Sequence, residues 1–196
     1  GTANNAQSVT LNAGTQGSVL VTGQVGNTVP LRTLTLANSH GATFSSAVTT
    51  GTSVVLSDTV AGQTIRFADD LSTPALTTTA NGYHLELLGS NTNVTGNTTF
   101  LNTGRLVLGD AAADSLSFAG GLTATAPSAI SAAGTVNTSN TAMRLGDSDT
   151  AITLTGDLTL STAGGDLTLG GALNGTAANT QSLTLNAGSA GAVGVT

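Results

Sequence analysis

The amino-acid sequence predicts an all-β fold, a parallel β-helix (β-solenoid) with about 18–22 residues in each coil. Three observations point to this fold. Strand-like triplets recur along the chain, many intervals between them match a half or a whole coil of that length, and the composition disfavours helices. Thr, Asn, Ser and Gly are poor helix formers, and the Leu and Val residues alternate with small polar residues instead of recurring every three or four positions.

Each predicted strand is a triplet in which two apolar residues flank one residue that is most often Thr. Such a triplet turns two side chains toward one face and one toward the other, as a half-buried strand requires. Gly, Asn, Asp and Ser lie between the triplets and favour sharp turns. In chain order, the thirteen predicted strands are Val9–Leu11, Val19–Val21, Leu34–Leu36, Val54–Leu56, Ile65–Phe67, Leu85–Leu87, Leu106–Leu108, Leu116–Phe118, Ile152–Leu154, Leu158–Leu160, Leu167–Leu169, Leu183–Leu185 and Val193–Val195.

The triplets also predict which side chains form the core. The outer two residues of a triplet should be buried, and the middle residue should face solvent. Thr35, Arg66, Val107 and Thr184 are middle residues and are expected on the surface. The expected buried set includes Leu34, Leu36, Ile65, Phe67, Leu106, Leu108, Leu116, Phe118, Leu183 and Leu185.

The strand spacing favours a solenoid over an Ig-like sandwich, which also shows strands every 8–12 residues. Strands of three to five residues are short for a sandwich. The tripeptide LGD at 108–110 also returns at 145–147, and we interpret this step as two coils of about 18 residues each. Leu71–Gly82 and Thr125–Asn140 are less regular, and each is expected to form either a poor coil or a surface loop.

A longer repeat organises the chain. Residues 175–196 restate residues 1–22, with identical residues at 15 of the 22 positions and an offset of 174. We therefore expect a single solenoid segment over residues 1–196, made of one tandem repeat (1–174) and the start of the next copy (175–196). At about 4.8 Å per coil, one repeat would form a rod segment of roughly 40 Å.

The charge distribution excludes several functions. The net charge is −6, lysine is absent, and the four arginines are spread along the chain, so the clustered cations that nucleic-acid binding needs are missing. No apolar run approaches the roughly 18 residues of a membrane-spanning helix. The absence of Cys removes disulfides and thiol chemistry, which is compatible with export.

Residues 85–109, LELLGSNTNVTGNTTFLNTGRLVLG, resemble the autotransporter-associated β-strand repeat. The SLTLNAG-type strands elsewhere are similar in style to filamentous-haemagglutinin-like proteins of bacterial surfaces. These resemblances imply a right-handed parallel β-helix, export to the cell surface and a stalk or adhesin role, with no catalytic residues to transfer. The positions that match the repeat are Gly89, Asn91, Thr92, Thr95, Gly96, Thr98, Thr99, Gly104, Leu106, Leu108 and Gly109.

An enzymatic alternative would need carboxylates and basic residues collected on one outer face, as in polysaccharide lyases and hydrolases with this fold. Arg66 and Glu86 are middle residues of triplets one coil apart, so an outward pair is expected. An exposed ion pair of this kind contributes under about 1 kcal/mol and needs no catalytic role. The candidate residues for such a site are Asp58, Asp69, Asp70, Glu86, Arg66 and His84.

Calcium binding is another alternative, because hard cations prefer clusters of oxygen ligands and several aspartates lie in predicted turns. The known glycine-rich calcium repeats are absent, and Asp in a turn usually binds its own backbone. His40 and His84 lack neighbouring ligands and are expected to be surface residues. The aspartates concerned are Asp110, Asp114, Asp147, Asp149, Asp157 and Asp166.

Ice binding would need a flat face of regularly spaced outward threonines. Val55, Arg66, Glu86, Val107 and Ser117 occupy equivalent positions and are expected to interrupt such a face. Strand propensity is a simpler reason for the threonines. The outward threonines are Thr10, Thr35, Thr153, Thr159, Thr168 and Thr184.

We therefore expect a structural or adhesive repeat module in the rod-like stalk of a large exported bacterial surface protein, secreted or at the cell surface. No enzyme activity, catalytic residue, metal site or cofactor is expected. The expected partners are neighbouring repeats and other copies of the chain, stacked head to tail through uncapped solenoid ends, together with a surface or glycan receptor. The alternative function is a carbohydrate-binding or polysaccharide-cleaving β-helix.

Overall fold

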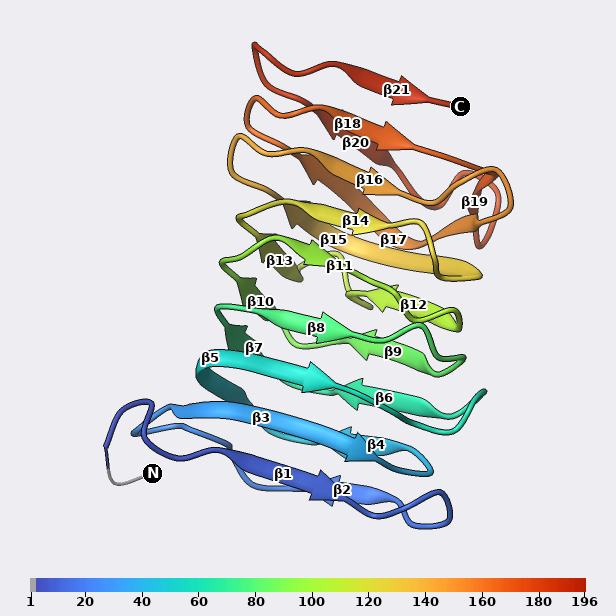
Figure 1. The fold of residues 1–196 in the computed structure, drawn as a ribbon. Helices are drawn as coiled ribbons and strands as arrows, with labels where there is room; N and C mark the ends of the chain where they lie inside the picture. The colour runs from blue at the N-terminus through green and yellow to red at the C-terminus, as the bar shows by residue number, and fades with distance from the viewer. Residues whose placement is uncertain (1–2) are drawn as a thin grey trace.

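A parallel β-solenoid of about eight turns forms in the computed structural model, which describes residues 3–196 (Figure 1). Every strand pairing in this part of the chain is parallel, and it contains no helix. In Figure 1 the near strands run from left to right while the chain climbs from the N-terminus to the C-terminus, which is the sense of a right-handed coil. This confirms the predicted fold class.

Each coil crosses three strand faces, which we name A, B and C in chain order. Strands of the same face stack on one another along the axis. Face A contains β1 (Val9–Asn12), β3 (Leu31–Asn38), the second half of β5 (Val48–Leu56), β8 (Leu76–Thr78), β11 (Thr98–Thr99), β14 (Leu122–Ala124), β16 (Met143–Leu145), β18 (Leu167–Leu169) and β21 (Val193–Val195).

Faces B and C complete each coil. Face B contains β2 (Val19–Val21), β4 (Ala42–Phe44), β6 (Thr64–Phe67), β9 (His84–Leu87), β12 (Arg105–Leu108), the first halves of β15 (Ala129–Asn137) and β17 (Ala151–Ser161), and β19 (Leu173–Gly175). Face C contains the first residues of β5, then β7 (Leu71–Thr73), β10 (Asn91–Val94), β13 (Ser115–Phe118), the second halves of β15 and β17, and β20 (Leu183–Asn186).

The coils are longer on average than expected. The shortest step between paired residues of face A joins Leu34 to Val54, and the longest joins Leu167 to Val193. Eight coil steps separate Val9 from Val193, which gives a mean of about 23 residues per coil. The interpretation of the LGD step as two coils is therefore wrong. LGD ends a strand of face B at Leu108 and a strand of face A at Leu145, so the step spans one and two-thirds coils.

The core follows the predicted alternation. Phe44 and Phe67 stack with their ring centroids 4.8 Å apart in adjacent coils, and all but two of the predicted core residues are buried. The two exceptions, Leu183 and Leu185, are half-buried because β20 has a neighbouring strand on one side only among the described residues. Val107 differs from its prediction, since it is only 9% exposed although it points outward.

All thirteen predicted triplets lie in strands, but nine further strands of the described chain contain none of them. Their inward positions are often held by small or polar residues. Thr73 of β7, for example, is buried and accepts a hydrogen bond of 2.7 Å at its Oγ1 from the hydroxyl of Thr50, a buried residue in the first half of β5, one coil earlier. Small and polar residues also hold inward positions in the two stretches expected to be less regular. Both stretches contain ordered strands, β7 and β8 in Leu71–Gly82 and β15 in Thr125–Asn140.

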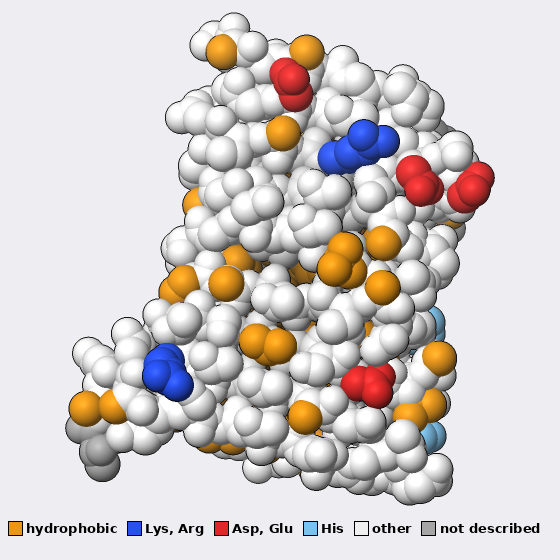
Figure 2. Space-filling model, in the orientation of Figure 1, with side chains coloured by type: hydrophobic (Ala, Val, Ile, Leu, Met, Phe, Trp, Pro, Cys, Tyr) orange, Lys and Arg blue, Asp and Glu red, His pale blue; other side chains and the backbone are white. Residues whose placement is uncertain are grey.

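The two ends of the described chain lie at opposite ends of the rod (Figure 1). Figure 2 shows one side of it, where most of the surface is neither charged nor apolar and acidic and basic side chains are few. Such a surface follows from a composition with only 7% charged residues.

Candidate functional site

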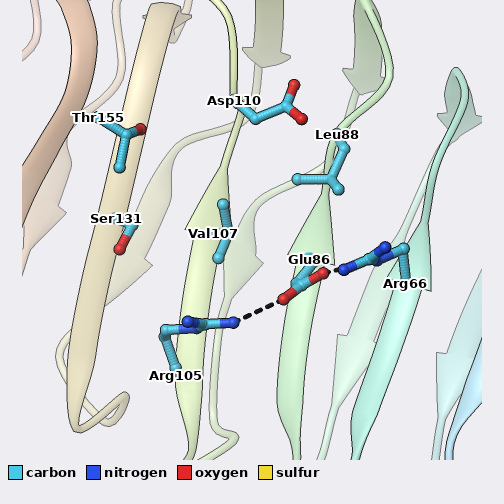
Figure 3. Close-up of a pocket in the computed structure, with 8 residues that line it drawn as sticks. All are labelled: Arg66, Glu86, Leu88, Arg105, Val107, Asp110, Ser131 and Thr155. Atoms are coloured by element: carbon cyan, nitrogen blue, oxygen red, sulfur yellow. Dashed lines mark hydrogen bonds and ion pairs between the residues drawn. The ribbon is translucent and has the colours of Figure 1, made fainter.

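The candidate site is a shallow groove of about 250 Å³ on face B (Figure 3). Side chains from β6, β9, β12, β15 and β17 line it, so the groove runs along the axis over five successive coils. The outward side chains of these stacked strands are short at Ser131 and Thr155 and long at the two arginines, and this difference in length makes the hollow. The lining residues are Arg66, Glu86, Leu88, Arg105, Val107, Asp110, Ser131 and Thr155.

Two arginines hold one buried carboxylate at this site. Oε2 of Glu86 lies 2.7 Å from Nε of Arg66, and Oε1 of Glu86 lies 2.7 Å from Nη2 of Arg105. Arg66 is the direct neighbour of Glu86 in the parallel ladder, whereas Arg105 stands two residues before Val107, the ladder neighbour of Glu86 on the other side. The arginine side chains are about half exposed (49% and 47%), but the Glu86 side chain is only 6% exposed.

The expected exposed pair is thus a cluster of three charges with a buried centre. Burying a carboxylate is costly unless it is paired, and here both of its oxygens are paired. The cluster carries a net charge of +1, and Asp110 is the further acidic residue in the lining of the groove. Guanidinium donors that do not face Glu86 remain on half-exposed side chains.

The other carboxylates proposed for an enzymatic site do not join this cluster. Asp58 accepts hydrogen bonds from the side-chain amides of Asn38 and Asn81 at a corner of the coils, over 3.2 and 3.0 Å. Asp69 accepts from the backbone N–H of Asp70, and Asp70 accepts from the backbone N–H of Asn91. These bonds fix corners between strands, and of the acidic residues considered for an enzymatic site only Glu86 lines the groove.

The two histidines occupy corners and strand ends. Nδ1 of His84 accepts a hydrogen bond of 2.8 Å from the backbone N–H of Arg105, so this nitrogen helps to position the strand that carries the arginine. His40 lies before β4, where its backbone N–H donates to the carbonyl of Gly17. Both residues are half-buried.

Asp110 lies on the wall of the groove, close to a second carboxylate. Partial burial raises the pKa of Asp110, and the negative charge of Asp114 raises it further. The Asp114 carboxylate itself accepts two hydrogen bonds of 2.9 Å, from the backbone N–H groups of Asp110 and Ala111. Asp114 is therefore a corner residue, whose carboxylate binds the backbone at the start of the corner.

Of the remaining aspartates considered for calcium, Asp147, Asp157 and Asp166 also bind backbone groups, whereas Asp149 accepts a hydrogen bond of 3.3 Å from the hydroxyl of Ser148. Oδ1 of Asp147 accepts from the Thr150 hydroxyl and from the Asp149 N–H, which lowers the pKa of Asp147. Asp157 accepts from the N–H and the hydroxyl of Ser182, which lowers its pKa, and Asp166 accepts from the N–H of Ala192. Within residues 3–196, no three Asp, Glu or His side chains form a group that could hold a metal ion.

The outward threonines are divided among the faces. Thr153 lies on face B and Thr159 and Thr184 on face C, whereas Thr10, Thr35 and Thr168 lie on face A. Face A carries more of them than the triplets predicted, and Val55 and Arg144 are the two side chains that interrupt its column. From the first coil to the eighth, this column reads Thr10, Thr35, Val55, Thr77, Thr99, Thr123, Arg144 and Thr168.

Sequence reasoning missed Arg105, Ser131 and Thr155 as groove residues. Arg105 precedes its triplet instead of standing in the middle of it, and Ser131 and Thr155 belong to strands whose coil phase the triplets did not fix. Aligning the strands with the observed coil length would have identified Arg105. It stands two residues before Val107, so its side chain points outward on the same face as those of Val107 and Glu86.

Comparisons with known proteins give no family: no family model, no curated protein and no solved structure matches this chain. In the described residues there is no helix that could cross a membrane.

Proposed function

We propose that this chain is a structural or adhesive module that forms part of the rod-like stalk of a large exported bacterial surface protein. The observation that carries the proposal is the way residues 175–196 continue the solenoid. They restate residues 1–22, and their strands β20 and β21 stack on β17 and β18 in unbroken register. A sequence that restarts without interrupting the coils suits a protein that lengthens by adding copies.

The surface chemistry supports the same role. The carboxylates outside face B mostly hold coil corners, and the outer faces carry small polar side chains. The resemblance of residues 85–109 to the autotransporter-associated repeat supports location at the cell surface or secretion. We assign no catalytic residue and no cofactor to the module.

Electron microscopy of a lengthened protein tests this proposal. In the lengthened protein, residues 1–174 precede the full chain, so that it contains one extra copy. Stacking at about 4.8 Å per coil predicts a particle about 37 Å longer than the single chain and of the same width. A wider particle, or two rods joined at a hinge, would contradict a continuous stalk.

The groove on face B favours a second candidate function, the binding or cleavage of a carbohydrate chain. Its length along several coils suits an extended polymer, and the half-exposed Arg66 and Arg105 offer donors to sugar hydroxyls or carboxylates. Titration with neutral and acidic oligosaccharides tests it. A glycan site on face B is supported if Arg105→Gln abolishes binding and Arg144→Gln, a change on face A, preserves it. Equal loss of binding in both variants would count against such a site.

A further inference from the structure

The repeated segment occupies two different pairs of faces. In its first copy β1 lies on face A and β2 on face B, whereas in its second copy the equivalent β20 lies on face C and β21 on face A. The offset of the repeat therefore spans seven and two-thirds coils. The second copy is turned back by one face, a third of a turn about the axis.

The local conformation is the same in both places. Asn5 and Asn179 have positive φ angles of 56° and 59°, and Gly14 and Gly188 have φ angles of 67° and 71°. The side chain of Asn12 accepts a hydrogen bond of 3.1 Å from the N–H of Gly14, and Asn186 accepts one of 3.0 Å from Gly188. The segment thus encodes a strand, a corner and a second strand, and it fits more than one pair of faces.

The LGD repeat behaves in the same way. Gly109 follows a strand of face B and Gly146 follows a strand of face A, with φ angles of 74° and 72°. A carboxylate fixes the corner after each LGD stretch, but from different positions: Asp114 lies four residues after the first LGD, whereas Asp147 is the aspartate of the second. Two independent repeats are therefore displaced by one face, so one short sequence can form a corner at two different places in the coil.

Both ends of the rod expose apolar side chains that an added coil would cover. Val9 is 37% exposed at one end, and Val193 and Val195 are 48% and 59% exposed at the other. Between residues 3 and 22 no residue is buried. Residues 175–196 have additional side-chain anchors to their own molecule, since Asp157 holds Ser182 and Asp166 holds Ala192.

We propose that the C-terminal end of this chain binds a second copy of the chain by strand replacement: residues 175–196 of one molecule take the place of β1 and β2 on β3 and β4 of the next. This inference rests on the proposed function, since it describes how one copy continues another. Leu183 and Leu185 would then be covered on both sides. The register follows from β1, so Thr184 of one molecule lies beside Thr35 of the next.

The joint turns the second copy by one face relative to the first. A groove on face B of one copy therefore points a third of a turn away from the groove of the next copy, and the direction recurs after three copies. A stalk built in this way presents the Arg66–Glu86–Arg105 cluster in three directions around its axis instead of along one side.

Cysteine crosslinking between chains of residues 1–196 tests the joint, because this sequence has no Cys. Chains with Thr35→Cys are mixed with chains with Thr184→Cys at high concentration, and a short bifunctional thiol reagent is added. Crosslinked dimers are expected from this pair, and excess peptide of residues 1–22 should reduce their yield by competing for β3. The matched control pairs Thr10→Cys with Gly194→Cys or with Asn174→Cys, which would meet if intact ends stacked without replacement.

Each outcome decides the proposal. Dimers from the control pairs alone would show stacking of intact ends and overturn strand replacement, while the proposed function as a stalk module would survive. An absence of dimers from every pair would overturn the joint, and the length of the two-copy protein would still test the rod separately. Within one chain, Thr159→Cys with Thr184→Cys should crosslink and Thr168→Cys with Thr184→Cys should not, which checks that the variants are folded with β20 on face C.

Discussion

Thr10 and Thr184 hold equivalent positions in the repeated segment, yet Thr10 pairs with Thr35 on face A and Thr184 pairs with Thr159 on face C. The division of each coil among three faces allows this difference, since each face needs only a short strand followed by a corner. The segment therefore fixes its local conformation but not its face. The number of residues between the two copies determines which face the second copy occupies. The offset of 174 residues therefore sets the rotation of the second copy relative to the first.

The core should be most sensitive in the central coils. Leu106 is fully buried on β12, whereas Leu185 is half-buried on β20. Leu106→Ala should lower the free energy of unfolding by about 3 kcal/mol, because it leaves a cavity between packed coils, and Leu185→Ala by about 1 kcal/mol. Urea denaturation followed by circular dichroism measures both. Equal losses would mean that the end coil is as tightly packed as the centre.

Glu86 should contribute to stability through its two ion pairs. Glu86→Gln keeps the shape of the side chain but leaves Arg66 and Arg105 without a negative partner, so we expect a loss of about 2 kcal/mol. Arg66→Gln, which removes one half-exposed partner, should cost about 1 kcal/mol or less. The same denaturation experiment in 1 M salt should reduce the difference between Glu86→Gln and the native chain. No effect of either variant would show that the buried carboxylate is not stabilised by the arginines.

The sequence predicted the solenoid because alternation of apolar and polar residues is a local signal that survives in every coil. It predicted Arg66 beside Glu86 for the same reason, since both stand in the middle of a triplet. The pattern failed where threonine replaces leucine inside, as at Thr50 and Thr73, because the buried hydroxyls are satisfied by hydrogen bonds between coils that composition alone does not reveal. It also failed for the groove, whose outline depends on the coil phase.

Corner glycines should differ in their tolerance of alanine. Gly109 has a φ of 74°, and a Cβ there would lie 2.5 Å from the carbonyl oxygen of Ala133. Gly14 has a φ of 67°, but its Cβ would have no heavy atom within 4 Å. Gly14→Ala should therefore cost about 1 kcal/mol for the left-handed conformation alone, and Gly109→Ala about 3 kcal/mol because the backbone must also move. Thermal denaturation compares the two, and the reverse order would contradict the corner geometry.

Asp157 and Asp110 should affect the pH dependence of stability in opposite directions. The N–H and hydroxyl of Ser182 lower the pKa of Asp157 in the folded chain. A carboxyl whose pKa is lowered by folding stabilises the fold above its unfolded pKa of about 3.9, and this contribution is lost as the pH falls through the folded pKa. Asp157→Asn should therefore be less stable than the native chain at pH 7, and the difference should shrink below about pH 4.

Burial and Asp114 instead raise the pKa of Asp110, so the charged form of this group opposes folding at neutral pH. Asp110→Asn should accordingly be more stable than the native chain at pH 7, and this gain should disappear as the pH falls through the raised pKa toward about 3.9, where the native carboxyl is also neutral. Urea midpoints measured between pH 3 and pH 7 for both variants test the pair of effects. Variants that shift stability in the same direction at pH 7 would show that the hydrogen bonds of Ser182, or the proximity of Asp114, do not govern the two carboxyls.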